Sequence, residues 1–227
     1  MSDRGKPPAQ TPEATPSRPL PPADVDRGSH LGYLAHEVGN PLSIALWSAE
    51  LMGRLRPDER AGERGVKLSH LGARALGRIQ LLVEGHLLCE RLDAGGYPLR
   101  LGTVDVAALV GAALERLSLE PGPELHLAQG LAGRGDRVLL ERAIEGVVAV
   151  AGRDGTPVRI DGEAAAGQVR ITIRGAPVEP LVDPVKGSPS DPSGRALALP
   201  MARRVAAVLG GSLTAISEGY LLVFPAT

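Results

Sequence analysis

Two long stretches of helical periodicity, separated by a short polar break, constrain the first half of the chain. The first stretch ends near Arg56-Pro57, because proline disfavours helical geometry in the residue before it. The second ends at "DAGGYP", where two glycines and a proline break the helix. Apolar residues recur at steps of three and four at Leu31, Leu34, Ala35, Val38, Leu42, Ala45, Ala49 and Met52, and again at Leu68, Leu71, Ala75, Ile79, Leu82, Cys89 and Leu92. We therefore predict a helical hairpin over residues 25–94.

A single hairpin of this length carries more apolar surface than its two helices can cover. Pairing with a second copy would close a four-helix bundle through an isologous interface, which is the commonest arrangement of homo-oligomers. The sequence therefore predicts a homodimer.

The remaining segments differ sharply from the hairpin. Residues 1–24 are rich in proline, serine, threonine and charge and lack apolar periodicity, so we expect a disordered tail. Residues 97–227 alternate strand-like and helix-like stretches and hold a Pro/Gly-rich loop at about 175–193. The predicted order is strand 99–104, helix 105–117, strand 124–128, helix 136–152, strands 157–162 and 168–174, helix 194–211, and strands 212–217 and 220–225. We predict an α+β protein of several parts, in which a two-layer α/β sandwich follows the hairpin.

Composition excludes several classes of function. Aromatic residues are only 2% of the chain and the net charge is -1, which argues against a nucleic-acid platform. The single cysteine, Cys89, cannot form an internal disulfide, and no Cys/His cluster offers a metal site. No apolar run approaches the roughly 18 residues that span a bilayer. We expect a cytoplasmic protein without a metal, nucleic-acid or membrane partner.

The run "HEVGNP" is the part of the first helix that looks suited to chemistry. His36 lies two residues from both Leu34 and Val38, so its imidazole should point into solvent, with Glu37 beside it and Asn40 one turn further on. A neighbouring carboxylate can bond one ring nitrogen and leave the other free as a nucleophile. Gly39 and Pro41 cost roughly 4 kcal/mol of helix propensity here, which favours a role other than stability.

Other interpretations of this histidine can be compared with the spacing. A zinc protease would need a second histidine at the position of Asn40. A serine hydrolase would need a nucleophile elbow, which the chain lacks. A solvated histidine without a chemical role remains an alternative on the residues alone.

"LAHEVGNPLS" resembles the phosphoacceptor motif of two-component sensor histidine kinases, His-Glu-x-x-Asn-Pro-Leu, and the order of elements after it is similar to their ATP-binding domain. The resemblance covers nearly all of the chain after the tail. It implies that His36 carries a phosphoryl group, that Glu37 is the acid/base residue, and that Asn40 positions the phosphoryl group or a water molecule.

The ATP-binding residues of that family do not recur here. In the matching registers, Gly146 and Val150 replace two asparagines, of which the second would hold magnesium, and Gly175 replaces the adenine-binding aspartate. Pro177 and Glu179 replace two glycines of the next motif, and Ala196 and Ala198 replace two more downstream. Phosphoryl transfer from ATP depends on such positioning. We therefore expect no bound ATP and no magnesium held by this chain.

The resemblance and the eroded positions together imply a dimeric histidine phosphotransferase with a vestigial kinase domain. It would exchange a phosphoryl group between His36 and aspartates of response-regulator receiver domains, which supply the magnesium, and an upstream hybrid kinase is a further candidate partner. Three alternatives stay open: a divergent active histidine kinase, a non-catalytic dimeric regulator that binds a response regulator or a kinase, and a phosphatase that uses Glu37 and Asn40.

Overall fold

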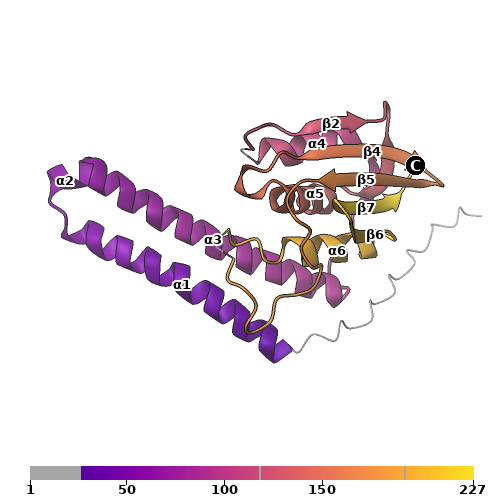
Figure 1. The fold of residues 1–227 in the computed structure, drawn as a ribbon. Helices are drawn as coiled ribbons and strands as arrows, with labels where there is room; N and C mark the ends of the chain where they lie inside the picture. Colours follow the sequence, from indigo (N-terminus) through magenta and orange to yellow (C-terminus); the bar gives the residue numbers. More distant parts are fainter. Residues whose placement is uncertain (1–26, 118, 192) are drawn as a thin grey trace, which may run out of the picture.

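The computed structural model describes residues 27–117, 119–191 and 193–227, so the predicted tail lies outside the described residues. Helices α1 (Arg27–Arg54) and α3 (Glu63–Asp93) form the predicted antiparallel hairpin, which projects from the rest of the chain (Figure 1). A short helix, α2 (Pro57–Ala61), occupies the break between them and begins at the proline. None of the described helices is both long and apolar enough to cross a membrane.

The second half is an α/β domain. Its strands are β1 (Leu101–Asp105), β2 (Glu124–Leu127), β3 (Ala132–Asp136), β4 (Arg159–Ala165), β5 (Gln168–Arg174), β6 (Ser212–Ile216) and β7 (Gly219–Pro225). Its helices are α4 (Val106–Glu115), α5 (Arg137–Ala151), a 3-10 turn (Arg153–Gly155) and α6 (Ala198–Val208). Five strands form a sheet in the order β2-β4-β5-β7-β6, in which only β2 and β4 are parallel, and β1 pairs with β3 in a separate antiparallel ribbon.

Local chemistry explains where the helices of this domain begin. The Asp105 carboxylate accepts a hydrogen bond from the backbone N–H of Ala108, and Asp136 does the same for Val138 and Leu139, so both aspartates cap helices as predicted. Helix α6 begins at Ala198, later than the predicted residue 194. Gly194 has a φ of +75°, which is not helical, and Leu197 packs on Tyr33 and Leu34 of α1. These elements confirm the predicted fold class of a helical hairpin followed by a two-layer sandwich.

The core of the domain lies between one face of the large sheet and helices α5 and α6. Ile160, Ile171, Ile173, Leu222 and Phe224 point inward from the strands and are fully buried. The end of α3 joins this core through Leu88, Cys89 and Leu92, so the hairpin and the domain share apolar contacts. Burial raises the pKa of the Cys89 thiol to about 12.

An ion triad fastens the end of the hairpin to the domain. Arg204 on α6 is buried, and its Nη1 and Nη2 atoms donate to the two carboxylate oxygens of Asp183 at 2.8 and 2.6 Å. Its Nε atom donates to both carboxylate oxygens of Asp93 of α3, at 2.9 and 2.8 Å. Burial by itself would raise the pKa of Asp183, but the hydrogen bonds and charge of Arg204 outweigh it and lower that pKa. Arg204 thus joins α6 both to the loop between β5 and α6, through Asp183, and to the end of α3, through Asp93.

Candidate functional site

His36 and Asn40 lie on the exposed surface of α1, one turn apart, as the spacing predicts. Neither side chain makes a hydrogen bond to another described residue. Gly39 between them has open space where a side chain would stand, so an incoming surface can approach the imidazole closely. Helix α1 continues through Pro41, which is buried against the hairpin interior.

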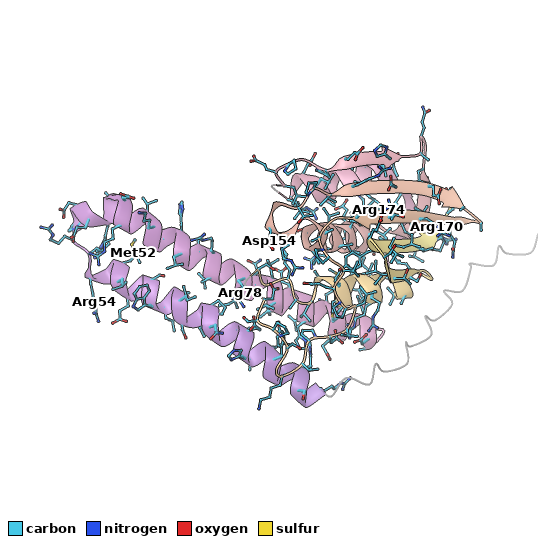
Figure 2. All side chains as sticks on the ribbon, in the orientation of Figure 1. Met52, Arg54, Arg78, Asp154, Arg170 and Arg174 are labelled. Atoms are coloured by element: carbon cyan, nitrogen blue, oxygen red, sulfur yellow. The ribbon has the colours of Figure 1, made fainter. Side chains whose placement is uncertain are left out.

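Glu37 is placed differently from our prediction. We expected its carboxylate beside the imidazole, but Glu37 is fully buried at 0% exposure on the face that packs on α3, where it pairs with Arg78. One carboxylate oxygen also accepts a hydrogen bond from the backbone N–H of Asp191, at 3.2 Å. Figure 2 shows Arg78 on α3 where the loop between β5 and α6 meets the hairpin.

The reason for this difference is a shift of the buried face by about one residue. Tyr33, Glu37 and Pro41 follow each other at steps of four and form the face that packs on α3. The predicted stripe instead contains Leu42, which is exposed. The seam between α1 and α3 contains small and polar groups, such as Gly72 against Ser48, whereas many large apolar side chains of the hairpin remain outside.

Three of the expected nucleotide positions lie at the end of α5 and around it, and packing fills the space at two of them, Gly146 and Gly175. A Cβ atom on Gly175 would lie 2.3 Å from the carbonyl oxygen of Ala151, so no side chain fits there without a backbone shift. A Cβ atom on Gly146 would lie 3.2 Å from the Cβ of Ala198, where α5 approaches the start of α6. Val150 is buried and offers no oxygen to a metal.

The remaining replaced positions, residues 177, 179 and 196, differ in what they contact. Glu179 pairs with Arg153, and its backbone N–H donates a hydrogen bond to the Tyr220 hydroxyl oxygen at 2.7 Å. Pro177 is exposed, and Ala196 packs beside the buried Leu197. Among the described residues, no group of three or more His, Cys, Asp or Glu side chains could hold a metal ion.

A cavity of about 700 Å³ remains beside these positions, between the end of α5, the long loop and α1. Its wall carries four carboxylates (Asp154, Glu179, Asp183 and Asp191) and two guanidinium groups (Arg153 and Arg195). Two of the carboxylates are already paired, Glu179 with Arg153 and Asp183 with Arg204. Beyond these pairs, Asp154, Asp191 and Arg195 carry the remaining charges of the wall.

Sequence reasoning missed the groups around Glu37, namely Arg78, Asp191 and Tyr33. Burial, together with the carboxylates of Glu37 and Asp191, raises the pKa of Tyr33 to about 12, so its phenol stays neutral. The pairing of Arg78 with Glu37 could not be predicted, because the two residues are 41 positions apart and no local sequence pattern links them. The signal that could have found it is the four-residue spacing of Tyr33, Glu37 and Pro41, which places Glu37 on the seam.

A comparison with protein-family models gives no match, and neither does one with curated protein sequences. Solved structures do match. The Acinetobacter baumannii histidine kinase AdeS has a TM-score of 0.61 at 19% identity over 84% of this chain and 95% of that chain. Histidine kinase ThkA, solved in complex with the response regulator TrrA, has a TM-score of 0.59 at 14% identity over 88% and 62%.

Full-length ShkA, solved in complex with AMPPNP, has a TM-score of 0.56 at 23% identity over 86% of this chain and 45% of that chain. This chain therefore spans less than two thirds of ThkA and ShkA. The shared feature of these neighbours is the helical hairpin followed by the α/β domain. The chain thus has the fold of histidine kinases, as its motif resemblance implies.

Proposed function

We propose that this protein is a histidine phosphotransferase of a two-component phosphorelay. It accepts a phosphoryl group on His36 from the phosphorylated aspartate of a receiver domain and passes it to another receiver aspartate, in the cytoplasm and without ATP. The observation that carries the proposal is the contrast at Gly175, where the backbone leaves no room for the nucleotide-binding carboxylate, while His36 remains exposed. The neighbour ThkA, in complex with a response regulator, supports the choice of partner.

The transfer needs no redox or external reagent. A ring nitrogen of neutral His36 attacks the phosphorus atom, the bond between phosphorus and the aspartyl oxygen breaks, and the receiver carboxylate leaves with the electron pair. The imidazole then releases the proton from its other nitrogen to a base. The receiver's own magnesium ion neutralises the phosphoryl oxygens, so this chain needs to supply only the nucleophile and its positioning.

A homodimer fits the outer surface of the hairpin. Large apolar side chains are exposed along both long helices, which is unusual for a monomer surface. They are Leu31, Leu42, Ile44, Leu46, Trp47, Val66, Leu76, Leu81, Val83 and Leu87. A second copy that covers this face would close the four-helix bundle. We expect light scattering to give twice the chain mass, and Trp47→Glu to shift the protein to monomer.

The decisive test is incubation with a receiver phosphorylated by a small-molecule phosphodonor. We expect wild-type protein to take up label that is stable to base and labile to acid, which distinguishes phosphohistidine from phosphoserine. His36→Ala should take up none. His70→Ala is the matched control, because His70 is also exposed on the hairpin but lies outside the motif, and it should label normally. Equal labelling of His36→Ala would refute the proposal, and unlabelled wild type with intact cellular signalling would favour a non-catalytic regulator.

A divergent active kinase is the second candidate, and the remaining cavity of about 700 Å³ is the observation that favours it. The neighbour ShkA binds AMPPNP, so a related fold can hold a nucleotide. Titration with Mg-ATP, followed by incubation with γ-labelled ATP, separates the two candidates. Saturable binding with label on His36 supports the kinase, whereas label from the phosphorylated receiver alone supports the phosphotransferase.

A further inference from the structure

The long loop of the α/β domain lies across the hairpin beside the phosphoacceptor motif (Figure 1). We call its described residues 183–191 and 193–197 the strap. The backbone N–H of Lys186 donates to the carbonyl oxygen of Ser29 at 3.0 Å, and a ring nitrogen of His30 lies 2.9 Å from the carbonyl oxygen of Pro184. Leu197 packs on Tyr33 and Leu34. The strap therefore contacts the first turns of α1 on the side of the helix that carries Glu37.

Glu37 is held between the strap and α3. Its Oε2 atom accepts from both Arg78 and the backbone N–H of Asp191, which belongs to the strap. Its Oε1 atom and the Nε atom of Arg78 are buried without a hydrogen-bond partner among the described residues. A buried ion pair with unsatisfied atoms contributes little to stability, because desolvation offsets much of the attraction. Separation of the pair costs little when both charged groups regain water as the strap moves away.

Gly194 connects the strap to Arg78 on the other side. Its φ of +75° suits glycine, and a Cβ atom there would lie 2.6 Å from Cγ and 3.1 Å from the carbonyl oxygen of Arg78. The strap thus touches both partners of the pair, Glu37 through Asp191 and Arg78 through Gly194. Loops longer than about 15 residues without regular structure are uncommon inside a compact domain and are usually either functional or disordered, and the contacts of the strap hold it in one place.

We propose that Arg78 is a positioning residue that, with the strap, holds the Glu37 carboxylate buried between α3 and the strap, away from His36. Undocking of the strap separates the pair and frees the Glu37 carboxylate to accept the proton from the second ring nitrogen of His36 during phosphoryl exchange. This inference rests on the proposed function for its chemical consequence. Its mechanical half, the coupling of the strap to the pair, stands on the contacts alone.

The test uses full-length variants that disturb the pair from different sides. Gly194→Ala presses on Arg78 and leaves every charged group in place. Gly187→Ala is its control, since Gly187 also lies in the strap with φ +93° but has nothing within 4 Å. Arg78→Gln removes the charge, Arg78→Lys restores it, and Glu37→Gln removes the carboxylate while keeping its shape. Circular dichroism and urea unfolding verify that each variant folds.

Hydrogen exchange of the strap peptides is the first measurement. We expect Gly194→Ala, Arg78→Gln and Glu37→Gln to lower the protection of the strap by about tenfold, with Gly187→Ala near wild type and Arg78→Lys in between. The combined Arg78→Gln and Glu37→Gln change should add little to either one, because both break the same contact. Unchanged protection in Gly194→Ala and Arg78→Gln would overturn the coupling.

The initial rate of phosphoryl exchange with a phosphorylated receiver is the second measurement. We expect Gly194→Ala and Arg78→Gln to raise the rate by about tenfold, because the strap is undocked and Glu37 is free in a larger fraction of the molecules. Glu37→Gln should lower it, although it loosens the strap equally, because it removes the carboxylate that accepts the proton. A looser strap without a change in rate would overturn the positioning role. If no variant labels at all, the proposed function fails, and hydrogen exchange still decides the coupling.

Discussion

His36 and Asn40 lie exposed on the hairpin without a side-chain partner among the described residues, whereas Gly146 and Gly175 of the α/β domain are closed by packing. Gly175 meets the carbonyl of Ala151, and Gly146 meets Ala198. In the hairpin, polar groups remain where they gain nothing for the fold. In the domain, polar side chains are absent at Gly175 and Gly146, where close packing stabilises the fold. This difference separates side chains that an incoming partner can reach from positions that close packing occupies.

The largest expected effect is on the ion triad that joins the two halves. Arg204→Ala leaves Asp183 buried without its partner, so we expect a loss of about 3–5 kcal/mol in the free energy of unfolding, measured by urea denaturation. Arg203→Ala is the matched control, because the neighbouring arginine makes no ion pair with a described residue. If the two variants are equally stable, Arg204 does not hold the halves together.

The next effect concerns the closed nucleotide position. Gly175→Ala forces a Cβ atom against the Ala151 carbonyl, and we expect a loss of about 3 kcal/mol in the free energy of unfolding. Gly102→Ala, in β1 with open space around it, should change stability by far less. Gly175→Asp should be destabilised likewise and gain no Mg-ATP binding in calorimetry. A stable Gly175→Asp that binds nucleotide would contradict the closed position.

A smaller effect should appear in acid. The pKa of Asp183 is lowered in the folded protein, so its contribution is fully present above the unfolded pKa, near 3.9, and is lost as pH falls through the folded value. Urea midpoints measured from pH 6 down to pH 3 should therefore decline in wild type. Asp183→Asn should be less stable at pH 6 and decline less steeply, and a parallel decline would show that other carboxylates dominate.

The smallest effect is expected on the hairpin surface. His36→Ala and Asn40→Ala should change the free energy of unfolding by at most about 0.5 kcal/mol, since both side chains are exposed and unpaired in the described structure. Thermal denaturation at fixed protein concentration measures this change in stability. A large loss from either variant would show that the motif supports the fold, and the contrast between the two halves would then disappear.

Periodicity and helix caps were enough to predict most elements of the fold. The hairpin follows from its apolar stripes, and Asp105 and Asp136 mark helix starts. Strand β3 was missed because its sequence, "AGRGD", contains two glycines, which weaken strand propensity. The structure needs them, because Cβ atoms on Gly133 and Gly135 would lie 2.4 and 2.6 Å from Phe224 and Leu140. Such tertiary contacts cannot be read from a local pattern.

The candidate site shows the same limit. The exposure of His36 and Asn40 follows from their place on a helix, so sequence alone could predict it. The burial of Glu37 could not be predicted in this way, because it depends on Arg78 of another helix and on the backbone of Asp191 in a distant loop. Short motifs specify which residues are present, while long-range contacts decide which of them are accessible.

The buried thiol has a practical consequence for studying this protein. Cys89 is the single cysteine of the chain, and with a pKa of about 12 it carries almost no thiolate at neutral pH. Cysteines engineered at exposed positions, such as Gly187 in the strap and Lys67 on α3, should therefore react selectively with maleimide dyes. A fluorescence-transfer pair at these two positions would report the distance between strap and hairpin in single molecules, without first removing the native cysteine.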